Sequence, residues 1–216
     1  MPAGGTGLVL RGLRKEPATI GKWHLGWDLT YKEGKAKTVD NIDFTKRVAN
    51  GPTDRGFDYF YGLTSPSGPP HLYMVNDMAE KQPNTRFEES GGGLYKIKGG
   101  IGHSDWSSDG MQPHLADKML EYLDENKDSD KPFFLYMALT APHIPPFPSK
   151  EFKGKSKIGD YGDLVMMIDD IVGRVNRKLK EIGKYNNTIV MFAADNGCAG
   201  YINMDRINRK GHYPSY

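Results

Sequence analysis

Two apolar runs on either side of an amphipathic segment constrain the fold of this chain most. Residues 133–139 (Phe-Phe-Leu-Tyr-Met-Ala-Leu) and 188–194 (Thr-Ile-Val-Met-Phe-Ala-Ala) have strand length and a continuous apolar character. Such runs are typical of strands buried on both faces of a parallel sheet. Between them, apolar residues recur at three- and four-residue steps over residues 161–183, which predicts a helix ending at Gly183. A strand, a helix and a strand in this order predict a right-handed parallel crossover and therefore an α/β fold.

Polar residues follow each predicted strand. His143 lies between two prolines just after the first run, and Asp195-Asn196-Gly197 follows the second run. The carboxyl ends of parallel strands meet at one edge of a sheet, where ligands bind in open α/β folds. Asp195 and Asn196 offer the oxygen ligands that calcium or magnesium prefers. Taken alone, however, Asp-Asn-Gly is more often a plain turn, and a histidine between prolines is more often structural.

A third segment, the hexapeptide Gly21-Lys22-Trp23-His24-Leu25-Gly26, places a lysine and a histidine two residues apart between glycines. In an extended backbone Lys22 and His24 point to the same side. A cation and an imidazole aimed at one place suit an anionic group whose leaving oxygen needs a proton. Spacing alone favours the alternative of a surface turn with a lone lysine and a core tryptophan.

The rest of the chain predicts loops and one more helix. Residues 17–20 could end a short strand, and residues 27–70 read as a loop that contains an aromatic cluster at 55–62. Residues 82–110 are polar and glycine-rich, which predicts a long surface loop of the kind that shapes a substrate pocket. Apolar periodicity predicts a helix from about Pro113 to about Asn126.

Composition excludes several classes of protein. The 216 residues are enough for one sizeable domain, and the formal net charge of +2 gives no electrostatic case for a nucleic-acid partner. No apolar run approaches the roughly 20 residues that a membrane-spanning helix needs. The single cysteine, Cys198, excludes an internal disulfide framework.

Taken together, these motifs resemble the sulfatase family, the formylglycine-dependent sulfuric ester hydrolases. The matches are the hexapeptide around Lys22, Ala141-Pro142-His143-Ile144-Pro145 after one strand and Asp195-Asn196-Gly197 after the next, and the resemblance runs from about Ala18 to the last residue. It implies an alkaline-phosphatase-like α/β/α sandwich with a mainly parallel central sheet, incomplete at both ends. It also implies that residues 1–216 are part of the N-terminal catalytic domain.

The resemblance implies roles for individual residues. Lys22 would bind the sulfate oxygens, His24 would assist the hydroxyls of the hydrated formylglycine, and His143 would contact the sulfate and help the alcohol leave. Asp195 and Asn196 would coordinate calcium. His212, in a terminal segment similar to that of sugar-cleaving members, would touch the substrate. The substrate would be a sulfated small molecule or glycan, and the family's usual locations are periplasmic, secreted or lysosomal.

The sequence also departs from the family pattern. It contains no Cys/Ser-x-Pro-x-Arg motif to supply formylglycine, no consecutive aspartates near the N-terminus and no Arg-Gly-x-Lys segment. We therefore expect an internal portion of a sulfatase that is inactive or nearly so and binds calcium weakly. One alternative is a nucleophile-free relative that binds sulfated ligands or a partner. Another is a two-zinc phosphoesterase of the same superfold, which would need more His and Asp ligands than this chain offers.

Overall fold

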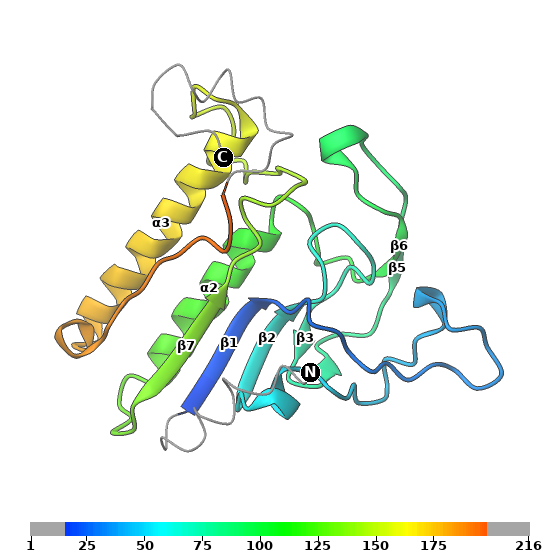
Figure 1. Cartoon of the computed structure of the whole chain (residues 1–216), viewed down its shortest axis with the longest axis horizontal. Coiled ribbons are helices and arrows are strands. Elements are labelled where there is room, and N and C mark those ends of the chain that lie inside the picture. Colours follow the sequence, from blue (N-terminus) through cyan, green and yellow to red (C-terminus); the bar gives the residue numbers. More distant parts are fainter. Residues whose placement is uncertain (1–15, 198–216) are drawn as a thin grey trace.

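The computed structural model describes residues 16–197, which form a five-stranded mixed sheet with helices against it (Figure 1). β1 lies near the centre and pairs in parallel with β2 on one side and β7 on the other. Short antiparallel strands extend the sheet beyond β2. In spatial order the strands are β4 (Met78–Ala79), β3 (Met74–Val75), β2 (Tyr59–Leu63), β1 (Glu16–Lys22) and β7 (Phe133–Ala138).

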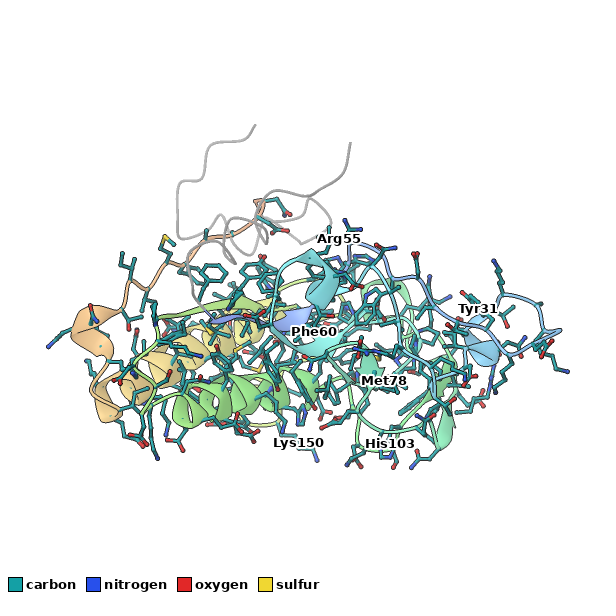
Figure 2. All side chains as sticks on the ribbon, turned by 90° about the horizontal axis from the view of Figure 1, so that it is seen from below. Tyr31, Arg55, Phe60, Met78, His103 and Lys150 are labelled. Atoms are coloured by element: carbon teal, nitrogen blue, oxygen red, sulfur yellow. The ribbon has the colours of Figure 1, made fainter. Side chains whose placement is uncertain are left out.

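Two long helices cover one face of this sheet within the described residues. α2 (Met111–Glu125) and α3 (Asp160–Glu181) pack on each other, and their apolar stripes meet Ala18 and Ile20 of β1 in the main core. Both helices begin and end within two residues of the predicted bounds, because their amphipathic patterns are long and local. Figure 2 shows the helices together on one side of the sheet, with the buried Phe60 at the middle of the molecule.

The other face of the sheet carries a second, smaller core. Trp23, Phe44 and Phe57 pack there around Phe60 and Leu72, and the loop between β1 and β2 supplies most of this layer. Four single-turn 3-10 helices punctuate the connections: η1 (Val39–Asn41), η2 (Pro52–Arg55), η3 (Gly93–Tyr95) and η4 (Tyr185–Asn187). The aromatic cluster at residues 55–62, predicted as a loop, is in fact the entry into the buried strand β2.

The glycine-rich segment predicted as a long surface loop contains a two-stranded antiparallel ribbon. Its strands are β5 (Thr85–Phe87) and β6 (Gly100–Gly102). His71, 1% exposed, holds the ribbon: its backbone N–H donates to Ile101, and its Nε2 lies 2.7 Å from the Lys98 carbonyl oxygen, to which it donates. We call residues 82–106, which include this ribbon and η3 at its tip, the arm (Figure 1).

Two expectations about buried strands are wrong. β7 forms as predicted, but it is only half-buried, with Tyr136 52% exposed, because it lies at the edge of the described sheet and the helices cover one face only. Residues 188–194 form no strand, and Ile189 and Met191 are 86% and 82% exposed. A strand needs a hydrogen-bonded neighbour, and among residues 16–197 this segment has none.

The α/β class and the parallel pairing at the centre of the sheet are nevertheless as predicted. Of the three layers of an α/β/α sandwich, residues 16–197 form the sheet and one helical layer. None of the helices in that range is long and apolar enough to cross a membrane.

Candidate active site

The carboxyl end of β1 supports the first two candidate residues. Gly21, the last residue of β1 before Lys22, has φ of +130°, and a Cβ atom there would lie 2.0 Å from the carbonyl oxygen of Ala138 in β7. Its neighbour Gly62 in β2 is equally confined, with a Cβ position 1.7 Å from the Gly21 oxygen. Only glycine allows three strands to approach so closely. The glycines therefore place the Lys22 backbone tightly between β2 and β7.

Trp23 fixes the residues on either side of it. Its side chain is 7% exposed and packs edge-on against Phe57, with ring centroids 6.4 Å apart. Its backbone N–H donates to the Leu63 carbonyl at 2.9 Å, and its indole N–H donates to the Gly26 carbonyl at 3.2 Å. With Trp23 buried in the smaller core, Lys22 remains half-buried and His24 exposed. The buried Trp23 and the exposed His24 and Leu25 also fit the alternative of a surface turn beside a core tryptophan.

Electrostatic effects show which charged groups lie together at this end of the sheet. Burial lowers the pKa of Lys22, and the Asp195 carboxylate acts in the opposite direction. The Lys22 charge lowers the pKa of His24, with smaller contributions from burial and from His143. These effects act over short distances, so Asp195 and His24 both lie near Lys22, and His143 lies near His24.

His143 sits on the loop that follows β7. Its backbone N–H donates to the Thr140 carbonyl at 3.0 Å, and its ring Nδ1 bonds the carbonyl oxygen of Ile144. Because a carbonyl oxygen can only accept, Nδ1 must carry a proton. In the neutral ring, Nε2 is then the basic nitrogen, which can take up a proton or release one.

One positioning residue was missed by sequence reasoning. Gln112, 2% exposed, lies on α2 beneath the His143 loop. With its amide oxygen toward the loop, it accepts from Thr140 N–H at 3.0 Å and from Ala141 N–H at 2.5 Å, and it also bonds the Thr140 hydroxyl. The sequence signal that could have identified Gln112 is a glutamine on the apolar face of a predicted helix, because a buried amide needs hydrogen-bond partners.

The proposed calcium ligands are present but do not make a complete site. Asp195 and Asn196 are both exposed, and the Asn196 side-chain N–H donates to the Gly197 carbonyl at 2.7 Å. Their oxygens suit calcium chemically, but calcium takes six to eight ligands. Within residues 16–197 no group of three or more His, Cys, Asp or Glu side chains could hold a metal. The described residues therefore offer the type of ligand that calcium prefers, but too few of these ligands for a complete site. His212 and Cys198 lie outside the described residues.

Comparison with known proteins indicates the family of this chain. The model of the Sulfatase family matches residues 9–213. N-acetylgalactosamine-6-sulfatase from Sus scrofa is 32% identical over 192 residues, covering 88% of this chain and 32% of that protein. The uncharacterized sulfatase YdeN from Escherichia coli strain K12 is 32% identical over 191 residues, covering 83% of this chain and 30% of that protein. The chain thus spans about a third of the length of these curated relatives.

Solved structures show the same fold at lower sequence identity. A Bacteroides thetaiotaomicron sulfatase from work on the metabolism of multiple glycosaminoglycans superposes with a TM-score of 0.71 at 22% identity, covering 93% of this chain and 48% of that chain. PsFucS1 sulfatase from Pseudoalteromonas sp. gives a TM-score of 0.55, also at 22% identity, over 82% of this chain and 34% of that chain. The fold is therefore alkaline-phosphatase-like. From its sequence match over residues 9–213, the chain belongs to the sulfatase family.

Proposed function

We propose that this chain carries part of the active site of a sulfuric ester hydrolase acting on a sulfated glycan or a sulfated small molecule. The observation that carries the proposal is the shared neighbourhood of Lys22, His24 and His143 at the carboxyl end of β1 and β7. The relatives named N-acetylgalactosamine-6-sulfatase favour a glycan. We also propose that residues 1–216 belong to the catalytic domain, and that the protein is periplasmic, secreted or lysosomal.

Lys22 would bind the sulfate group, and His24 beside it would assist the hydroxyls of the hydrated formylglycine. Lys22 presents a compact positive charge from the end of a strand, and half-burial strengthens its attraction for an anion. The same positive charge disfavours protonation of His24 in the free protein. A bound sulfate would raise the pKa of both side chains, so the anion and the protons would bind together.

His143 would act on the leaving alcohol. Its Nδ1 is held by the Ile144 carbonyl, so a protonated ring has its second N–H at Nε2. Transfer of that proton to the ester oxygen as the S–O bond breaks would let the alcohol leave uncharged. Gln112 would support this role by holding the backbone of Thr140 and Ala141 in place.

Asp195 and Asn196 would supply two of the calcium ligands, and His212 would contact the sugar. In the family, formylglycine provides the nucleophile and calcium neutralises the sulfate charge. Since no Cys/Ser-x-Pro-x-Arg motif occurs in the 216 residues, we propose that the chain by itself binds a sulfate ester without turning it over. The binding of sulfated ligands without catalysis is therefore the state to test.

The test is binding of N-acetylgalactosamine 6-sulfate to the full chain, followed by NMR of the histidine ring resonances. Lys22→Met should weaken binding about tenfold or more, since a hydrogen bond to a charged group contributes roughly 1.5–3 kcal/mol. His143→Gln should weaken it less. Lys37→Met, which removes an exposed lysine from the distant loop after β1, is the matched control and should change nothing. Unchanged affinity in Lys22→Met would overturn the proposal.

A further inference from the structure

The loop between His143 and α3 concentrates positive charge. Residues 150–157 contain Lys150, Lys153, Lys155 and Lys157 with a single acid, Glu151. Their net charge of +3 exceeds the +2 of the whole chain, so the remainder of the protein is slightly acidic. We call residues 149–158 the lysine loop.

The backbone of the lysine loop is held by a buried carboxylate. Asp163, in the first turn of α3, is fully buried and accepts from the Gly154 N–H at 2.7 Å and the Ser156 N–H at 2.5 Å. The Ser156 hydroxyl in turn accepts from the Ile158 N–H at 3.0 Å. The half-buried Phe152 packs against the main core. The lysines are therefore displayed from an ordered backbone, which lowers the entropic cost of binding through them.

The four lysines are exposed and have no ion-pair partner among the described residues. The acids next to the loop are engaged elsewhere: Asp163 holds the loop backbone, and Asp160 accepts from the Tyr95 hydroxyl at 3.0 Å. Lys96 of the arm, by contrast, pairs with Glu89 at 2.9 Å. Uncompensated charges of one sign create a positive potential that attracts anions.

The lysine loop lies within reach of the candidate active site. Lys150 lies seven positions after His143 in the chain, so the two backbones are at most about 25 Å apart. Phe147, between them, packs edge-on against Tyr95 of the arm, with ring centroids 5.9 Å apart. Tyr95 in turn bonds Asp160 just beyond the loop. Figure 2 shows Lys150 at the surface of the molecule.

We propose that the lysine loop is a second anion-binding subsite, which holds further sulfate groups of a linear sulfated polysaccharide whose reacting ester lies at Lys22 and His143. This inference rests on the proposed function and narrows its substrate class from any sulfate ester to a polyanionic glycan. Lysine suits such a ligand, because a flexible point charge follows sulfates whose positions vary along a chain. An isolated small ester would occupy only the first site.

A nucleic acid or an anionic membrane is less consistent with these observations. Within the described residues, the only cation–aromatic contact of the lysine loop is internal, with the Lys155 ammonium 5.0 Å from the Phe152 ring centroid. No aromatic residue on the loop is fully exposed for base stacking, and the loop is not an amphipathic helix that could lie in a membrane. The continuity of the loop with His143 favours a glycan.

The experiment compares two triple variants of the full chain with equal loss of charge. One carries Lys153→Gln, Lys155→Gln and Lys157→Gln, and the control carries Lys32→Gln, Lys35→Gln and Lys37→Gln, three exposed lysines of the loop after β1. The probes are a chondroitin 6-sulfate hexasaccharide and N-acetylgalactosamine 6-sulfate. Dissociation constants are measured by calorimetry or NMR titration between 50 and about 200 mM NaCl, a range over which phosphate-binding proteins lose affinity steeply.

We expect the lysine-loop variant to bind the hexasaccharide at least tenfold more weakly, and the control less than twofold. The slope of log Kd against log salt should fall by about 2 in the lysine-loop variant, on the scale of just under one counterion for each lost charge contact. Affinity for the monosaccharide should be unchanged. A Lys→Arg version at positions 153, 155 and 157 should retain hexasaccharide binding, and matching thermal unfolding would show that all variants fold.

Equal losses in both Gln variants, or none in the lysine-loop variant, would overturn the inference. So would tighter binding of a duplex RNA or of phosphatidylserine vesicles through the same lysines, which would assign the loop to another class of partner. The proposed function fails separately, if Lys22→Met leaves binding of the monosaccharide unchanged. Each result therefore bears on one of the two sites.

Discussion

Residues 16–27 and residues 188–197 each lead into polar candidate site residues, and they differ in structure. Lys22 and His24 end a segment that Glu16 and Thr19 make partly polar, whereas Asp195 and Asn196 follow a continuous apolar run. The first segment forms β1, with parallel strands on both sides. The second has no regular structure and leaves Phe192 68% exposed. An apolar run thus provides the capacity for a strand, and its hydrogen-bonded neighbours determine whether the strand forms.

The difference also separates two kinds of site residue. Lys22 and His24 are held by Trp23 in a packed core, so their positions are determined by the fold. Asp195 is close enough to influence Lys22, but the segment that carries it has exposed apolar residues and few fixed contacts. Catalytic positioning requires supporting residues that are themselves held in place. The β1 end meets that requirement within the described residues, and the Asp195 end does not.

The largest expected difference between the two segments comes from disturbing the strand packing beside Lys22. Gly21→Ala adds a methyl group 2.0 Å from the Ala138 oxygen at a φ of +130°, so it combines overpacking with backbone strain. We expect a loss of about 4 kcal/mol in the free energy of unfolding, measured by urea denaturation.

Gly197→Ala is the matched control in the second segment, since a Cβ there meets nothing within 4 Å. It should change the free energy of unfolding by less than about 0.5 kcal/mol. A similar loss in both variants would contradict the distinction between the two segments.

A second substitution pair compares the anchoring of the two segments. Trp23→Ala removes a buried indole with its edge contact to Phe57 and should cost about 3 kcal/mol. Phe192→Ala removes an exposed ring and should cost less than about 0.5 kcal/mol. Thermal and urea unfolding of the two variants would measure both values. A large loss in Phe192→Ala would show that residues 188–194 are packed in solution.

The smallest effects concern charge and sharpen the link between the two segments. Asp195→Asn removes the carboxylate that raises the pKa of Lys22, so that pKa should fall further. Lys22→Met removes the main cause of the lowered pKa of His24, which should rise toward its ordinary value of 6.5. NMR titration of the lysine and histidine side chains would measure both shifts. An unchanged pKa of Lys22 in Asp195→Asn would show that residues 188–197 do not lie next to Lys22.

The sign of the pH dependence follows from the same effect. The folded state has the lower pKa at His24, so between that pKa and 6.5 it binds fewer protons than the unfolded chain. The contribution of His24 to stability is therefore complete above pH 6.5 and is lost as the pH falls through the folded pKa. In Lys22→Met the folded-state pKa of His24 should rise, so the pH range over which stability changes should become narrower.

Sequence patterns predicted the two long helices better than the sheet. α3 was predicted because its apolar periodicity is local and because glycine is a common helix stop. In the structure Gly183 follows the end of the helix with φ of +71°. β2 was missed because Gly56 and the segment 65–70 on either side of it read as loop signals, whereas the register that pairs Tyr61 with Ile20 makes it a central strand. The ribbon of β5 and β6 was missed for a similar reason, since three-residue strands carry almost no periodic signal.

The candidate site was predicted from motifs, and its supports were not. Lys22, His24 and His143 follow strand ends, so topology alone brings them to one edge. Gln112 and Asp163 act through hydrogen bonds to loops 28 and 7 to 9 residues away in the chain. The sequence can indicate that a buried amide or carboxylate needs a hydrogen-bond partner, but only the folded structure shows which group that partner is.

The two borders of the sheet have different consequences for the behaviour of the chain in solution. β4, at one border, has two residues and offers almost no backbone for another molecule to pair with. β7, at the other, has six residues and no further strand beside it among residues 16–197. A molecule with one exposed edge strand can pair with a second copy to form a dimer. A molecule with two such edge strands could pair at both edges and form a fibre. Pairing of two copies through β7 of the described residues would therefore stop at a dimer, because β4 offers no second border of comparable length.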